Sequence, residues 1–256
     1  MATVNDILKF IESIAPKELA MEWDNAGLLC GQADKSVQKV LVALDPFTAV
    51  CEEAAKMGAD LLITHHPLIF QPLAAITDET TVGRAVMTLI KNNIAAINAH
   101  TNLDCVDGGV NDTLAETLQL TAIQKVPADG EGLLRMGKVD TQDLDAFLDR
   151  VEALLGCSGL RYVSGGKPVH KVAVGGGACG SELYAVIAAG CDTFVTADVK
   201  YNQFCDAKEL GLNLIDAGHF PTENPVVAVL AAKLQTQFPD LEVKISETHR
   251  DCVKYY

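Results

Sequence analysis

Six side chains of the metal-ligand type lie at or just after the ends of predicted strands in this chain. Two are adjacent histidines, and two further histidines each have a carboxylate four residues on. The six are His65, His66, His100, Asp104, His219 and Glu223. Neutral imidazole and carboxylate groups suit zinc, iron, manganese and related divalent ions. The pattern therefore predicts a metal site.

The number of donors predicts two ions. An open site for one ion needs three or four protein ligands. Six donors suit two ions ~3.5–4 Å apart, with Asp104 or Glu223 bridging both. On an extended strand His65 and His66 would point to opposite faces, but a strand end entering a turn fixed by Pro67 lets them approach neighbouring ions.

A structural role is the competing interpretation for each histidine taken alone, because a strand-end histidine is usually a hydrogen-bonded structural residue. The prediction therefore depends on four of the six histidines sharing this position. His170 and His249 lack the context, and we interpret them as structural or surface residues.

Alternating strands and helices position these residues. Strands are expected at 39–45, 59–66, 93–100, 170–174, 191–198, 212–219 and 241–246, and an irregular strand within 21–31. Helices are expected at 4–13, 46–58, 81–92, 110–120, 141–156, 181–190, 201–211 and 224–239, with a polar, glycine-containing segment at 126–137. This alternation predicts an α/β fold with a largely parallel sheet, whose strand carboxyl ends share one edge.

The second half of the chain resembles the first. Lys39 aligns with Lys171 at an offset of 171 − 39 = 132, which also aligns Gly58 with Gly190 and His66 with Asp198. Further on, His100 aligns with His219 at 219 − 100 = 119. We therefore expect two related α/β sandwich domains from an internal duplication. They are residues 1–125, completed by the C-terminal segment, and residues 126–256.

Composition excludes several classes of function. The formal charge of −14 argues against a nucleic-acid or membrane-surface footprint, although a bound metal would still admit a small anionic substrate. No apolar run has the length of a membrane span, and the start of the chain is an acidic amphipathic helix, so we expect a cytoplasmic protein. The eight cysteines form no Cys-x-x-Cys pair and are read as reduced core thiols.

Two further segments allow several interpretations. The turn "GGGACG" at 175–180 fits a dinucleotide fingerprint, a phosphate-binding turn, or a turn needed only for helix–strand packing, which is the favoured interpretation. Trp23 is expected in the core, and Asp24 and Asn25 are expected to cap or bond a turn, while placement of this segment near the metals is the alternative. No Gly-x-Ser-x-Gly is present, so a serine nucleophile has little support.

The ordered blocks of the chain resemble one known family. The blocks are "EWDNAGLLCG", "GADLLITHHPLIF", "NAHTNLD", "GGGACGSE", "TADVKYNQF" and "DAGHFPTE". The sequence is similar to the GTP cyclohydrolase 1 type 2 homologues, also known as Nif-three-like proteins, in their short form without an inserted middle domain. In "TADVKYNQF" the chain departs from the family, with Ala197 and Asn202 where a glycine and a later histidine are frequent.

The resemblance implies a dinuclear site in the cleft between two α/β domains, with His65, His66, Asp104, His219 and Glu223 as ligands. It implies that His100 lines the site as a supporting or acid/base residue. It also implies a homohexamer, arranged as a trimer of dimers.

These inferences lead to one main functional hypothesis and two rivals. The main hypothesis is a hydrolase that uses two divalent ions, zinc, iron or manganese, on a small-molecule substrate of nucleotide or phosphoester type. One rival is a metal-binding regulatory or scaffold protein without turnover. The other is an oxidoreductase that binds NAD or FAD at 175–180.

Overall fold

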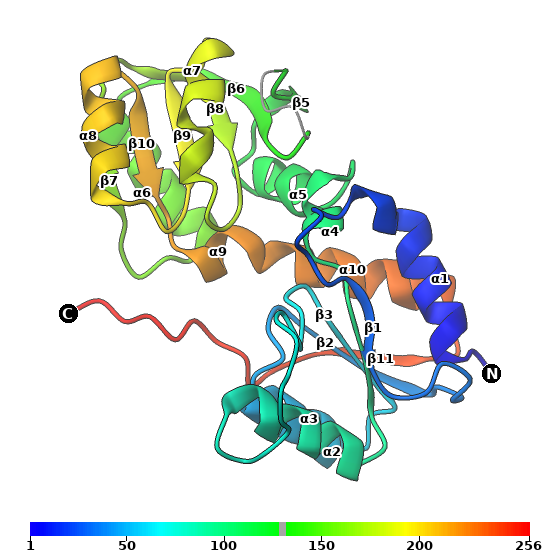
Figure 1. Cartoon of the computed structure of the whole chain (residues 1–256). Coiled ribbons are helices and arrows are strands. Elements are labelled where there is room, and N and C mark those ends of the chain that lie inside the picture. The colour runs from blue at the N-terminus through cyan, green and yellow to red at the C-terminus, as the bar shows by residue number, and fades with distance from the viewer. Residues whose placement is uncertain (128–131) are drawn as a thin grey trace. The chain divides into compact units, whose positions relative to one another are not determined.

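The computed structural model describes residues 1–127 and 132–256. The chain forms two α/β units, each with its own sheet (Figure 1). Unit 1 comprises Met1–Val106 and Val227–Arg250, and unit 2 comprises Asp107–Val226 and Asp251–Tyr256. The predicted architecture of two α/β domains is thereby confirmed, while the boundary predicted near residue 125 stays a prediction.

Unit 1 is built on a five-stranded sheet in the order β1-β4-β3-β2-β11. All neighbours pair in parallel except β1, which runs antiparallel to β4. The elements of this unit are α1 (Val4–Ile14), the 3₁₀ helix η1 (Lys17–Leu19), β1 (Gly27–Cys30), β2 (Lys39–Ala43), α2 (Thr48–Met57), β3 (Leu61–Thr64), α3 (Thr81–Lys91), β4 (Ala95–Asn98), α4 (Thr101–Cys105), α10 (Pro225–Gln237) and β11 (Glu242–Ile245).

The sheet of unit 1 is apolar on both faces. Leu41 and Leu62 pack with the helices α2 and α3 in one core cluster. Because successive strand residues point to opposite faces, the buried Val40 and Val42 belong to the other face. Figure 1 shows α1 across the sheet from α2 and α3. Burial on both faces explains why these strands read as continuous apolar runs.

Unit 2 has a six-stranded sheet in the order β5-β6-β8-β9-β10-β7. Only β8, β9 and β10 are mutually parallel, whereas β5, β6 and β7 pair antiparallel. The elements of this unit are α5 (Val110–Thr117), β5 (Thr121–Lys125), β6 (Arg135–Gln142), α6 (Leu144–Leu155), β7 (Arg161–Val163), β8 (Val169–Val174), η2 (Gly180–Glu182), α7 (Leu183–Ala188), β9 (Thr193–Thr196), α8 (Tyr201–Leu210), β10 (Asn213–Asp216) and α9 (His219–Glu223).

The prediction of a largely parallel sheet is therefore wrong for unit 2. The polar segment predicted at 126–137 overlaps β6, and its residues 128–131 lie outside the described residues. β5 and β7 also escaped prediction, because both strands are short and mostly exposed and therefore lack an apolar pattern.

Helices cover both faces of the sheet in unit 2. Val172 and Val174 of β8 pack with α5 and α6, and Ala173 between them packs with α7 and α8. Phe147 of α6 and Phe194 of β9 are fully buried in these two clusters. The three parallel strands are thus buried on both faces, and their carboxyl ends bear the polar loops.

The two units repeat the same hydrogen bonds at the predicted offset of 132. Asp60 accepts from the backbone N–H groups of Gln38 and Lys39 at 2.8 and 3.1 Å. Asp192 accepts from those of His170 and Lys171 at 3.1 and 2.7 Å. Each aspartate therefore ties the start of one parallel strand to the start of its neighbour.

The hydrogen bonds of the lysine side chains recur at the same offset as well. Lys39 Nζ donates to the carbonyl of Met57 at 3.5 Å, and Lys171 Nζ donates to that of Ala189 at 2.6 Å. Gly58 and Gly190, which follow these helices, both adopt left-handed backbone, with φ of +67° and +73°. Equivalent side chains thus make equivalent bonds within each unit, which supports the duplication.

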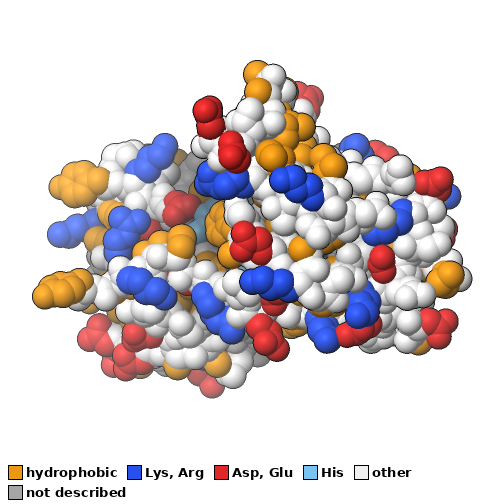
Figure 2. Space-filling view, turned by 90° about the horizontal axis from the view of Figure 1, so that it is seen from below, with side chains coloured by type: hydrophobic (Ala, Val, Ile, Leu, Met, Phe, Trp, Pro, Cys, Tyr) orange, Lys and Arg blue, Asp and Glu red, His pale blue; other side chains and the backbone are white. Residues whose placement is uncertain are grey.

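Charges of both signs cover the face of the molecule in Figure 2. Lys and Arg side chains are interspersed there with Asp and Glu side chains. Among the described ranges 1–127 and 132–256, no helix combines the length and the apolar character needed to cross a membrane.

The hydrogen bonds from Gln38 and Lys39 to Asp60, which we call the strand tie, predict a stability effect that depends on pH. Asp60→Ala removes the acceptor of two backbone N–H groups, so the free energy of unfolding in urea should fall by about 1–3 kcal/mol at neutral pH. Burial raises the pKa of Asp60, but bonds from Gln38 and Lys39 outweigh burial and lower the pKa overall. The stabilisation is therefore present above the ordinary carboxyl pKa and lost as the pH falls through the lowered value.

Exposed Asp34 provides the matched control, because Asp34→Ala should change the unfolding free energy by less than about 0.5 kcal/mol. An Asp60→Ala protein as stable as the Asp34→Ala protein at neutral pH would contradict the strand-tie interpretation.

Candidate metal site

Unit 1 brings together four of the six predicted residues, which we call the first donor set: His65, His66, His100 and Asp104. β3 and β4 are parallel neighbours, with Thr64 opposite Asn98 in register, so the loops after both strands lie at one sheet edge. One ligand atom from each of the three histidines falls within 4.8 Å of the others. Asp104 Oδ1 lies 3.6 Å from His65 Nε2.

The adjacent histidines lie on the same side because the chain leaves the strand at this point. The backbone N–H of His66 donates to the carbonyl of Leu44 at 2.9 Å, and Thr64 Oγ1 donates to the carbonyl of His66 at 2.7 Å. These bonds bend the chain, and the two imidazole centroids lie 4.9 Å apart. The predicted turn at the strand end therefore brings both rings to one place.

Each ring of the first donor set is held through its Nδ1 atom. The partners are the Ala99 carbonyl for His65 at 2.8 Å, Asp45 Oδ1 for His66 at 2.6 Å, and Asp24 Oδ1 for His100 at 2.8 Å. A carbonyl or carboxylate oxygen can only accept, so Nδ1 carries the proton and Nε2 carries the lone pair. Metal-binding histidines are oriented in the same way, which makes the set chemically suited to a divalent ion.

Asp24 has two roles at the start of α4. Its carboxylate accepts from His100 Nδ1 and from both the N–H and the hydroxyl of Thr101, at 3.1 and 2.5 Å. Burial raises the pKa of Asp24, but hydrogen bonds from His100 and Thr101 outweigh it and hold the pKa well below its ordinary range. Asp24 therefore bonds the start of α4, and the same carboxylate stays ionised beside His100.

Trp23 was expected in the core, and this prediction is wrong. Its side chain is 59% exposed. Its indole makes edge contacts with Phe70, at 5.8 Å between centroids, and with His100, at 6.3 Å. A lone tryptophan in a sequence carries no periodic signal that separates a core position from a position beside a site.

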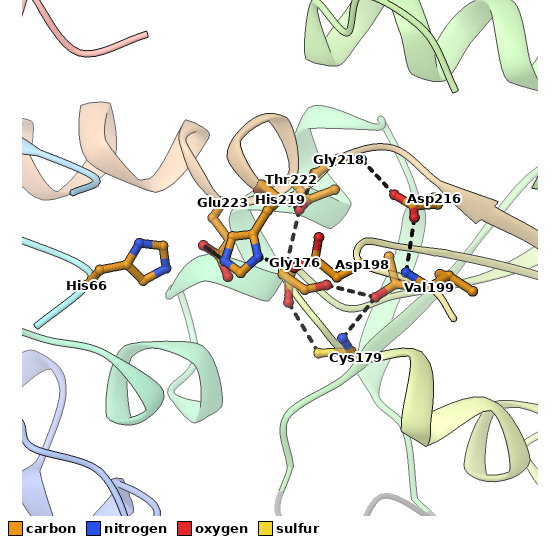
Figure 3. Close-up of polar contacts among 12 residues, drawn as sticks. His66, Gly176, Cys179, Asp198, Val199, Asp216, Gly218, His219, Thr222 and Glu223 are labelled. Carbon is orange, nitrogen blue, oxygen red and sulfur yellow. Dashed lines mark hydrogen bonds and ion pairs between the residues drawn. The ribbon is translucent and has the colours of Figure 1, made fainter. Parts of the chain in front are cut away.

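Unit 2 contains the second donor set, His219 and Glu223, on the short helix α9 after β10. His219 Nε2 lies 3.0 Å from Glu223 Oε2, and His219 Nδ1 lies 2.7 Å from Asp198 Oδ2 (Figure 3). The ring is thus held through Nδ1, as in the first donor set. Asp198 adopts left-handed backbone with φ +51°, a strained conformation for a residue with a side chain.

The buried carboxylate of Asp216 holds the loops that carry Asp198 and His219. It accepts from the N–H of Val199 at 3.0 Å and from that of Gly218 at 3.1 Å (Figure 3). Arg161 donates to the same carboxylate. The residues directly after Asp198 and directly before His219 are therefore fixed to one group.

The glycine turn makes room for Glu223. A Cβ at Gly177 would lie 2.1 Å from Glu223 Oε1 and 3.2 Å from His219 Cε1, and the φ of +63° at Gly177 also disfavours a side chain. A Cβ at Gly180 would lie 2.6 Å from Gln203 Oε1. The protein's own side chains thus occupy the space beside these glycines, in agreement with the packing interpretation of "GGGACG".

Among the cysteines with shifted pKa values, none has the lowered pKa of an activated nucleophile. Burial raises the pKa of Cys51 and Cys157 to about 12 and that of Cys191 to about 11. Cys205 and Cys252 are exposed, so the expectation of core thiols is wrong for these two.

Ala197 and Asn202, the departures from the family pattern, differ in their surroundings. Ala197 is fully buried, and its N–H donates to the Gly177 carbonyl at 2.9 Å. Asn202 is exposed on α8. Any influence of Ala197 on substrate specificity would therefore act through the packing of the glycine turn.

Comparison with known proteins defines the class of the chain. Residues 2–252 match the family model for Duf34/NIF3 (NGG1p interacting factor 3), and the chain belongs to this family. It is similar to the GTP cyclohydrolase 1 type 2 homolog of Clostridium perfringens, with 37% identity over 97% of each chain. The homolog of the same name from Streptomyces coelicolor is 37% identical over 98% of this chain and 93% of its own length.

A solved structure has the same fold. The Bacillus cereus protein described as related to NIF3 superposes with a TM-score of 0.93 at 26% identity, covering 100% of this chain and 99% of its own. The predicted family resemblance is confirmed by these matches.

The close approach at Gly177 predicts a steric effect that can be separated from backbone strain. Gly177→Ala combines a left-handed φ with a collision against Glu223, whereas Gly166→Ala has φ +75° and open space around its Cβ. Strain costs ~1–2 kcal/mol at either position, and overpacking adds ~1–3 kcal/mol at Gly177 alone. Urea unfolding of both variants measures the difference, and equal losses of stability would contradict a tight contact with Glu223.

Proposed function

We propose that the protein is a hydrolase dependent on two divalent metal ions, held by His65, His66, Asp104, His219 and Glu223. Its substrate would be a small molecule of nucleotide or phosphoester type. The observation that carries the proposal is the shared orientation of four histidines, whose Nδ1 atoms all meet a carbonyl or carboxylate oxygen. In the first donor set this leaves three Nε2 lone pairs as donors of the kind that zinc, iron and manganese accept, while His219 directs its Nε2 at Glu223.

Counting donors supports a shared centre. Two ions need more ligands than either set supplies, because one open site already uses about three protein ligands. The first donor set offers two ligand histidines and a carboxylate, and the second offers one of each. We therefore propose that each unit contributes part of one dinuclear centre.

The residues themselves would divide the chemical work. Divalent ions bound there would lower the pKa of a coordinated water and polarise the substrate. His100 is oriented by the ionised Asp24, so its Nε2 can accept a proton from the attacking water and return it to the leaving group. Asp24 would stabilise the imidazolium that forms between these two transfers.

The substrate class rests on the relatives. Several carry the name GTP cyclohydrolase 1 type 2 homolog, which supports a purine nucleotide, with hydrolysis at C8 opening the ring. A phosphoester would use the same ions and the same His100. The family resemblance also supports a cytoplasmic homohexamer, arranged as a trimer of dimers.

The first test is metal content. Elemental analysis of the anaerobically purified full chain should find two divalent ions per chain. His65→Ala and Glu223→Ala should each lower this number, because each removes a ligand from the same centre. His170→Ala is the matched control: it removes a histidine that also bonds through Nδ1, to the carbonyl of Val139 at 2.8 Å, away from the donor sets. Unchanged metal content in both ligand variants would defeat the assignment.

The second test separates a hydrolase from a metal-binding scaffold. A panel of nucleotides and phosphoesters should reveal turnover in the wild type, and His100→Gln should lower kcat ~10²–10⁴-fold while metal content is retained. Full metal occupancy without turnover across the panel would instead favour the regulatory or scaffold function. A His100→Gln protein with wild-type kcat would remove His100 from proton transfer.

A further inference from the structure

Asp45 lies between two histidines in unit 1. Its Oδ1 accepts from His66 Nδ1 at 2.6 Å, and its Oδ2 lies 2.9 Å from His249 Nε2. Asp45 follows β2 closely, while His249 follows β11, the parallel neighbour of β2. Each carboxylate oxygen thus has an imidazole partner, and the two partners are distant in sequence.

His249 is held firmly enough to fix a carboxylate. Its side chain is 4% exposed, and its ring centroid lies 5.7 Å from that of Phe47. Its backbone N–H donates to Ser246 Oγ at 3.1 Å. Burial, ring contact and this backbone bond together restrict the orientation of the imidazole.

The segment that carries His249 is tied to α2 by a single glutamate. Glu53 accepts from the N–H of Glu247 at 2.8 Å and from that of Thr248 at 3.2 Å, and it also accepts from the Ser246 hydroxyl. The strand β11, which precedes this segment, pairs with β2 along its length. His249 therefore has a fixed position relative to Asp45.

We infer that His249 is a positioning residue, which acts through Asp45 to hold His66 with its Nε2 lone pair presented as a ligand. A carboxylate held by one hydrogen bond can rotate about its side-chain torsions. A close ion-pair contact from a buried ring, with His249 Nε2 2.9 Å from Oδ2, restricts the carboxylate plane, so that Oδ1 stays on His66 Nδ1. The part of this inference that concerns metal affinity rests on the proposed function, and the part that concerns the His66 tautomer does not.

The competing interpretation is that the His249–Asp45 bond only anchors the C-terminal segment. Two substitutions separate these roles. His249→Phe retains a ring in the space but removes the polar contact with Asp45, and His249→Gln places an N–H group near the position of Nε2. An anchoring or packing role would leave the tautomer of His66 unaffected by either change.

The experiment uses the full chain and two measurements. Long-range ¹H–¹⁵N correlation spectra of the metal-free protein report which ring nitrogen of His66 carries the proton. Titration with Zn²⁺ against a chromophoric chelator reports affinity. His170→Phe is the matched control, because His170 also bonds through Nδ1 and is remote from Asp45 in sequence and in unit.

We expect His66 to carry its proton on Nδ1 in the wild type and in His249→Gln, and to become a mixture of tautomers in His249→Phe. The affinity for Zn²⁺ should fall ~10-fold or more in His249→Phe and stay near the wild-type value in His249→Gln and His170→Phe. His249→Ala serves as a second loss variant if the phenylalanine protein does not fold.

An unchanged His66 tautomer in the loss variants would overturn the inference. Equal losses of Zn²⁺ affinity in His249→Gln and His249→Phe would overturn it as well, because packing rather than the polar contact with Asp45 would then be responsible. If Zn²⁺ binds neither the wild type nor any variant, the proposed function fails. The tautomer of His66 in the metal-free protein still decides whether His249 is a positioning residue.

Discussion

An imidazole can serve as a metal ligand only if one nitrogen is free of its proton and faces the ion. This requirement explains most of the polar architecture around the donor sets. A backbone carbonyl fixes His65, and three aspartates fix His66, His100 and His219. The strands, in turn, hold these acceptors at the sheet edge where the histidines emerge. The fold thus determines the tautomer of the three rings in the first donor set before any ligand binds.

The duplicated framework uses equivalent positions for different chemistry. The offset of 132 aligns His66 with Asp198 and Asp45 with Gly177, since 177 − 132 = 45. In unit 1 these positions hold a donor and the carboxylate that orients it. In unit 2 they hold the carboxylate that orients His219 and the glycine that makes room for Glu223. Equivalent backbone positions therefore carry different polar groups in the two units.

The sequence predicted the fold class and the parallel strands that carry the donors, because buried parallel strands have continuous apolar runs and end at the histidines. It did not predict β6, whose polar residues such as Lys138 and Asp140 are exposed on an otherwise half-buried strand. Nor did it predict that Trp23 is exposed, because a single tryptophan beside a site produces no hydrophobic periodicity in the sequence.

The sequence also provided no indication of the carboxylates that accept from the histidine Nδ1 atoms. Asp45 and Asp198 are distant from their histidines along the chain, by 21 residues in both cases. Only the pairing of strands shows that they meet. His249, interpreted as structural or surface, is buried against Asp45 and gains its role from the pairing of β11 with β2. Residue type and local spacing thus indicate the candidate donors, whereas the groups that orient them require the fold.

The most direct test of the account is anomalous diffraction at the metal absorption edge, from crystals of anaerobically purified protein. The account predicts two anomalous peaks ~3.5–4 Å apart, each marking one metal ion. It also predicts that the Nε2 atoms of His65, His66 and His219 are the ligand atoms of these ions. Coordination through Nδ1, or peaks remote from these three rings, would contradict it.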